Sequence, residues 1–169
     1  MDRLIERLGD TPALEGPAAS LAAVAESTGL AAVARGARHR LGHPLHPALT
    51  DLPIGFWTSA WALDIVGGPG GADAARTLIG LGVATALPTI ASGLGDVAGL
   101  GPVKRRVAVL HGLANLAATG CYAASWTARR PGGDRGRGVR LGWMGAAIAT
   151  AGGALGGFLA LGDEPDSAS

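Results

Sequence analysis

The sequence predicts an all-α fold: an integral membrane four-helix bundle preceded by an amphipathic helical segment at the membrane interface. The chain has 169 residues, of which 48% are hydrophobic and 16% are charged, whereas soluble domains average roughly 25% charged residues. Residues 77–95, 107–128 and 141–162 contain no Asp, Glu, Lys or Arg. Each stretch is close to the ~20 apolar residues with which a helix crosses the hydrocarbon core of a bilayer. The alternative, a soluble bundle, would need helices with a charged face, which these stretches lack.

We expect four spans in a membrane domain that covers residues 42–162, at about 47–67, 74–96, 105–128 and 139–161. The first span is the least apolar, because its uncharged part lies between Asp51 and Asp64. Both carboxylates are expected to reach the lipid headgroups from the ends of this span. An even number of spans places both chain ends on one side, so we expect a multi-pass protein of the cell membrane.

The segments outside the membrane domain differ in composition. Residues 1–41 carry apolar residues at helical spacing among charged ones, which favours amphipathic helices on the membrane surface. A loosely ordered tail is the open alternative. Residues 163–169 are small and acidic, and we expect them to fray.

Glycine is concentrated in the fourth predicted span, where Gly152 with Gly156 and Gly153 with Gly157 form two G-x-x-x-G patterns. Small residues at this spacing let helix backbones approach closely in lipid. We expect these glycines to serve packing within the bundle first, and a homo-dimer through the fourth helix second.

The four-span topology predicts one polar site on the side of the chain ends, formed by His43, His46, Asp51, Asp96, His111 and Asn115. Because Pro44 and Pro47 follow His43 and His46, we expect both histidines to be non-helical or at most helix-capping. His111, inside an uncharged span, is the strongest candidate, since intramembrane ionisable groups mark function by default. His46 and then His43 are its candidate partners for a b-type haem or a metal ion of unknown identity. A neutral histidine that only holds helices together is the alternative.

Composition excludes several function classes. The net charge of +1 gives no electrostatic basis for nucleic-acid binding. The single cysteine, Cys121, excludes an internal disulfide and a cysteine-ligated cluster. No serine or cysteine stands beside a histidine in a nucleophile motif, so we assign no catalytic residue. A transporter would need polar groups through the bilayer, and the fourth span has almost none.

The stretch G-H-P-L-H-P-A-L-T-D-L-P-I-G at residues 42–55 resembles the signature of a bacterial family of predicted four-helix membrane proteins, catalogued as a domain of unknown function. Residues 91–96, 111–115 and 152–157 match the same family. Its members are often fused to, or encoded beside, a Rieske-type iron–sulfur domain. The resemblance therefore implies a redox-associated membrane subunit that works with an iron–sulfur partner in the lipid bilayer.

Two departures from the family pattern bear on this expectation. Val97 stands where relatives tend to have Trp, and Phe158 stands where many have His. The chain has no C-x-H and C-x-x-H pair, so the iron–sulfur partner would be a separate polypeptide. The competing hypothesis is a non-catalytic scaffold or assembly subunit, in which the His, Asp and Asn cluster is structural.

Overall fold

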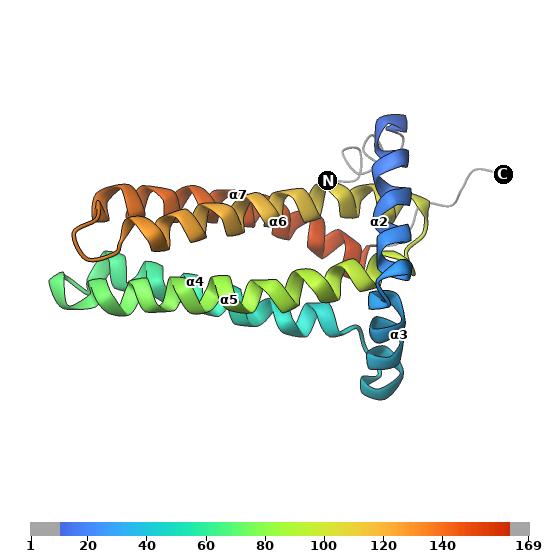
Figure 1. Ribbon diagram of the computed structural model, residues 1–169, viewed down its shortest axis with the longest axis horizontal. Helices are drawn as coiled ribbons and strands as arrows, with labels where there is room; N and C mark the ends of the chain where they lie inside the picture. The colour runs from blue at the N-terminus through green and yellow to red at the C-terminus, as the bar shows by residue number, and fades with distance from the viewer. Residues whose placement is uncertain (1–10, 163–169) are drawn as a thin grey trace. The chain divides into compact units, whose positions relative to one another are not determined.

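The computed structural model describes residues 11–162, and all regular structure in that range is helical, which confirms the all-α class (Figure 1). The α-helices are α2 (Glu15–Ser27), α3 (Leu30–Leu41), α4 (Leu45–Val66), α5 (Ala72–Val97), α6 (Pro102–Ala128) and α7 (Arg135–Leu161). Two short 3-10 helices, η1 (Pro12–Leu14) and η2 (Pro69–Gly71), precede α2 and α5. The expectations for residues 1–10 and 163–169 lie outside the described residues.

Three of the helices, α5, α6 and α7, are long and apolar enough to cross a membrane. They contain the three charge-free stretches except for Gly162, which follows α7, so the sequence pointed to the same three segments. The first predicted span coincides with α4, one 22-residue helix, which is not among the candidates. The pair α2 and α3 would qualify only as one broken span, and their axes meet at 75°.

The described residues form two compact units. The histidine unit contains residues 11–46, 90–113 and 151–162, and it holds all four histidines of the chain. The tryptophan unit contains residues 47–89 and 114–150, and it holds all four tryptophans. Helices α5, α6 and α7 each contribute one part to each unit.

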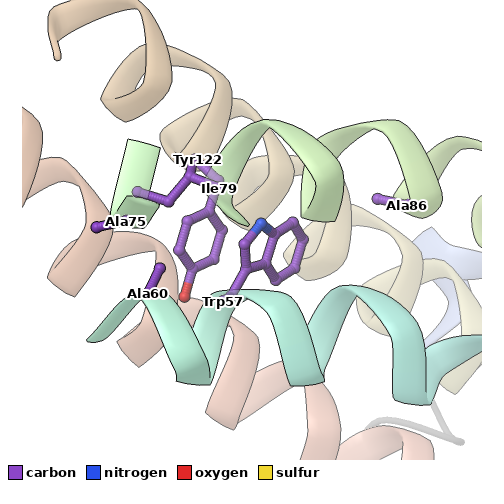
Figure 2. Close-up of a cluster of buried hydrophobic side chains, with 6 residues drawn as sticks. All are labelled: Trp57, Ala60, Ala75, Ile79, Ala86 and Tyr122. Carbon is purple, nitrogen blue, oxygen red and sulfur yellow. The ribbon is translucent and has the colours of Figure 1, made fainter. Parts of the chain in front are cut away.

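The core of the tryptophan unit is built around two stacked aromatic rings. The rings of Trp57 and Tyr122 lie 4.0 Å apart between centroids and are inclined by only 9°. Figure 2 shows both side chains together with the other buried residues of this core. Gly82 makes this position available to the indole, because a Cβ there would overlap the Trp57 ring. The stack therefore packs α4 against α5 and α6. The other buried members of the cluster are Ala60, Ala75, Ile79 and Ala86.

A buried ion pair joins α4 to the end of α6 in the tryptophan unit. The Arg129 guanidinium donates from Nη1 to Asp64 Oδ1 over 2.7 Å and from Nη2 to Oδ2 over 2.6 Å. The two side chains are only 3% and 4% exposed. The expectation that Asp64 reaches the lipid headgroups is therefore wrong. A bidentate arginine satisfies the carboxylate within the protein, and such pairs are among the strongest hydrogen-bonded arrangements.

Glycines on the first half of α7 allow this ion pair to sit against the helix. A Cβ at Gly138 would lie 2.5 Å from Arg129 Cγ, and one at Gly145 would lie 3.1 Å from the Tyr122 ring. The Ser125 hydroxyl donates to the Gly138 carbonyl over 2.6 Å and accepts from Arg129 Nε over 3.1 Å. Gly145 lies within the fourth predicted span and packs against α6, whereas Gly138 precedes that span.

The histidine unit begins with the bent pair α2 and α3. Gly29, between the two helices, has a left-handed φ of 77°, which glycine adopts without steric penalty. At Gly95 of α5, a Cβ would lie 2.6 Å from the Leu30 carbonyl oxygen, so α3 starts in direct contact with α5. An ion pair of 2.7 Å between Glu15 and Arg106 joins α2 to the start of α6. Within the described residues, the N-terminal segment is therefore helical and packed.

The buried ion pair generates a stability prediction. Asp64→Ala and Arg129→Ala should each lower the free energy of unfolding by about 3–5 kcal/mol, because each leaves an uncompensated buried charge. The double variant should lose less than the sum of the two. Thermal unfolding in detergent, followed by circular dichroism, measures these differences.

Arg135 provides the matched control for this experiment. Its Nη2 lies 3.9 Å from Asp64 Oδ1, but its side chain is 47% exposed. Arg135→Ala should change stability by less than about 1 kcal/mol, as is usual for exposed pairs. Equal losses from Arg135→Ala and Arg129→Ala would contradict the assignment of the bidentate pair as the stabilising contact.

Candidate functional site

The histidine unit brings together His46 and His111, two of the residues that the sequence singled out. Their ring centroids lie 6.1 Å apart, and the ring planes are perpendicular at 90°. His46 comes from α4 and His111 from the first half of α6. Two imidazoles from segments that are distant in sequence therefore form one side-chain pair, which we call the histidine pair.

His46 lies in the first turn of α4, which begins at Leu45. The expectation that His46 is non-helical or at most helix-capping is therefore wrong, whereas His43 does precede the helix. The physical reason is that the first turn of a helix tolerates proline, because its N–H groups have no intrahelical acceptor. Pro47 is thus accommodated one residue after His46, and the histidine is held on a helix.

The His46 ring lies against α5. A Cβ at Gly93 would lie 2.8 Å from both Cε1 and Nδ1 of His46. Ser92 Oγ lies 3.4 Å from the same Nδ1, within reach of a long hydrogen bond. The absence of a side chain at position 93 therefore makes room for the imidazole.

The His111 ring lies against α7 in the same manner. Its Nδ1 is 2.9 Å from the carbonyl oxygen of Gly152, and a Cβ at Gly156 would lie 2.8 Å from its Cε1. Because a carbonyl oxygen can only accept, Nδ1 must carry the proton. In the neutral ring, Nε2 is then the nitrogen with the lone pair. Histidines that bind metals are commonly oriented by such a hydrogen bond from the other nitrogen.

The remaining predicted site residues occupy different positions. Asp96 is half-buried in the histidine unit and interacts electrostatically with Arg38 and His46. His43 is exposed, and its Nδ1 lies 2.9 Å from the Pro44 carbonyl oxygen. The other two predicted members, Asp51 and Asn115, belong to the tryptophan unit, so their convergence with the histidine pair stays a prediction.

The described residues bring few metal-binding side chains together. They contain no group of three His, Cys, Asp or Glu side chains that could hold a metal ion. The histidine pair thus offers two imidazole nitrogens and no third ligand of these types. The centroid of the Phe158 ring lies 6.0 Å from Lys104 Nζ.

Four residues contact the two rings: Ser92, Gly93, Gly152 and Gly156. The family-like stretches at 91–96 and 152–157 contain all four. The sequence predicts packing at Gly152 and Gly156 but does not show which side chain fills the space above a glycine, and it does not single out Ser92 and Gly93.

Two neighbouring glycines of α7 allow a direct test of this packing. A Cβ at Gly156 meets the His111 ring, whereas one at Gly157 meets nothing within 4 Å. Gly156→Ala should displace the imidazole and lower the melting temperature. Gly157→Ala should leave the ring in place and stabilise the helix by up to about 1 kcal/mol.

Thermal unfolding and the imidazole NMR signals of His111 check both outcomes. The signals should shift in Gly156→Ala and remain unchanged in Gly157→Ala. If the two variants have the same melting temperature and the same signals, His111 does not pack on Gly156.

A comparison with known protein families identified one matching family. The model of the family DUF2231, described as a predicted membrane protein, matches residues 42–164, which include both histidines of the pair. Searches of the curated proteins and of the solved structures gave no match. Because the match covers more than half of the chain, this protein belongs to the DUF2231 family of predicted membrane proteins.

Proposed function

We propose that this protein is a multi-pass subunit of the cell membrane in which the histidine pair binds one redox-active metal centre. The observation that carries the proposal is the placement of two imidazoles from α4 and α6 at 6.1 Å between centroids. The hydrogen bond to the Gly152 carbonyl further selects Nε2 of His111 as the ligand nitrogen.

The separation of the rings is of the size that one shared metal requires. Histidine nitrogens bind such metals at about 2.0–2.1 Å, so two imidazoles on opposite sides of one ion have centroids about 6 Å apart. The perpendicular ring planes keep the two side chains from stacking on each other.

Among metal centres, a b-type haem agrees best with the number of ligands. The described residues offer two imidazoles and no third His, Cys, Asp or Glu around them. A bare ion of the usual kind needs three or four protein ligands, whereas a haem iron takes only its axial ligands from the protein. A bound haem would supply one-electron transfer, and the two histidines would tune its potential as axial ligands.

The proposal includes a partner of defined chemistry. These 169 residues contain one cysteine, so the proposal places the iron–sulfur centre outside them. The resemblance to a family whose members accompany Rieske-type domains supports a separate iron–sulfur protein as the electron-transfer partner. The role of this chain would be to hold the second centre within the membrane.

A visible absorption spectrum tests the metal centre. We expect the full chain, expressed with iron and a haem precursor and purified in detergent, to show a Soret band that shifts on reduction. Metal analysis should give about one iron per chain. No Soret band together with no stoichiometric metal would overturn the proposal.

Histidine variants identify the ligands. His111→Ala and His46→Ala should each abolish or strongly weaken the band, because each removes an axial ligand. His39→Ala, an exposed residue of α3, is the matched control and should leave it unchanged. His43→Ala separates the third predicted ligand, and an unchanged band would remove His43 from the site. A band that survives His111→Ala would discard this ligand.

A second candidate function is a non-catalytic scaffold in which the histidine pair is structural. The observation in its favour is that both rings pack against glycine positions, Gly93 and Gly156, and thus fill space between helices. In that case His111→Phe would retain much of the thermal stability, and neither wild type nor variant would contain metal. Stability and metal content therefore distinguish the two functions.

The membrane topology in the proposal is the four-helix bundle formed by α4, α5, α6 and α7. Three of these helices are candidate spans, and α4 would complete an even number with Asp64 neutralised by Arg129. Reporter fusions at residues 20 and 165 should report the same side of the membrane, and a fusion at residue 134 the opposite side. Different sides for residues 20 and 165 would show an odd number of spans.

A further inference from the structure

Three of the four tryptophans share one relation to the charged residues of the tryptophan unit. Each indole lies three residues from a charge, which is about one helical turn, and it lies on the uncharged side of that charge. The three pairs are Trp61 with Asp64 of α4, Trp126 of α6 with Arg129, and Arg140 with Trp143 of α7. We call the three indoles the tryptophan layer. The proposed metal centre uses none of them.

Two contacts place α4 level with its neighbours. The rings of Trp61 and Trp143 are stacked, with centroids 4.9 Å apart and planes inclined by 20°. One turn further along α4, Asp64 forms the buried ion pair with Arg129. Helix α4 therefore has its indole beside an indole of α7, and its charge beside a charge that directly follows α6.

Helix α5 has no tryptophan, but it accommodates the one from α6. A Cβ at Gly80 would lie 2.7 Å from Trp126 Nε1, so the indole fills the space above this glycine. One turn before Gly80, Arg76 places its guanidinium carbon 4.8 Å from the centroid of the Trp126 ring. This distance is within the range of a cation–π interaction. All four helices of the unit thus contribute to one layer of indoles bordered by charges.

The tryptophan layer lies where the charges stop. Three arginines directly adjoin the uncharged stretches of α5, α6 and α7: Arg76, Arg129 and Arg140. The side chains of Trp126 and Trp143 are 40% and 45% exposed, although an indole is a large apolar ring with only one polar group. Such rings are enriched at the headgroup level of membranes, where one end is apolar and the other is wet. Long arginine side chains near helix ends extend to the same level.

We propose that the tryptophan layer lies at the headgroup level of one leaflet of a phospholipid bilayer. The exposed parts of Trp126 and Trp143 contact the lipid where headgroups meet acyl chains, and Arg76 and Arg140 extend from there towards the lipid phosphates. This placement rests on the proposed four-helix topology, because it needs α4 at the same depth as the candidate spans α5, α6 and α7. The match to a family of predicted membrane proteins favours a bilayer over a protein partner at this surface.

Fluorine NMR of the full chain in phosphatidylcholine–phosphatidylglycerol nanodiscs measures the depth of each indole. The tryptophans are labelled as 5-fluorotryptophan, and variants with one tryptophan replaced by phenylalanine assign the signals. Lipids that carry a nitroxide, either on the headgroup or at the end of an acyl chain, broaden the signals of nearby nuclei. We expect the headgroup nitroxide to remove most of the intensity of Trp126 and Trp143, and the chain-end nitroxide to remove much less. Trp57 is the control, because it is 7% exposed and lies one turn deeper than Trp61 along α4, so the headgroup nitroxide should affect it least.

Two identical substitutions on α5 test the same boundary through stability. Ala74 and Ala84 are both exposed, but Ala74 precedes Arg76, whereas Ala84 lies one turn beyond Gly80 on the uncharged side. Ala84→Asp should lower the melting temperature in nanodiscs, because a carboxylate within hydrocarbon is costly. Ala74→Asp should leave it unchanged, since a carboxylate in the first turn of a helix is favourable. If Ala84→Asp yields no folded protein while Ala74→Asp does, the outcome has the same meaning.

Several results would overturn this placement. Stronger broadening of Trp126 and Trp143 by the chain-end nitroxide would put the tryptophan layer inside the hydrocarbon core, and no broadening by either nitroxide would put it outside the bilayer. Equal melting temperatures of Ala74→Asp and Ala84→Asp would show that α5 has no membrane boundary between them. The Soret band and the reporter fusions test the metal centre and the number of spans by separate signals, so a failure of the proposed function is distinguishable from a failure of this placement.

Discussion

The close approach of α7 to α6 through glycine is the constraint on which both units depend. A side chain of α6 donates a hydrogen bond to a glycine carbonyl of α7 in each unit: Ser125 to Gly138 in the tryptophan unit, and His111 to Gly152 in the histidine unit. Helix carbonyls already accept from the backbone, but each oxygen has a second lone pair. Without a Cβ in the way, a polar side chain of a closely packed neighbouring helix can reach that lone pair.

The tryptophan unit shows how an apolar chain accommodates a charge. Asp64 and Arg129 are almost fully buried, and two charges taken out of water are stable only when geometry and additional hydrogen bonds are good. The bidentate contact, the Ser125 hydroxyl and the space above Gly138 provide both conditions. Such a pair adds little to stability over an apolar replacement, but a wrong register of α4 against α6 would leave either charge alone.

The histidine unit differs from the tryptophan unit in composition. It contains all the histidines and the basic start of α6, whereas the tryptophan unit contains the stacked aromatic core. Two imidazoles with restrained orientation form one potential ligand set. The same long helices therefore contribute one segment to the stacked aromatic core and another segment to the unit that contains the histidine pair.

The sequence by itself predicted the helical class and the segments of the three candidate spans, and it singled out His46 and His111, whose rings the structure places near each other. Charge-free stretches of about 20 residues have few alternatives to a membrane helix, and a lone histidine within one is conspicuous. Only the tertiary structure decided which polar groups meet: Asp64 with Arg129 rather than with headgroups, His46 on a helix rather than before it, and each imidazole over its glycine. The reason is that spacing along a helix defines a face, whereas the partner of that face depends on how closely and in which register a second helix packs.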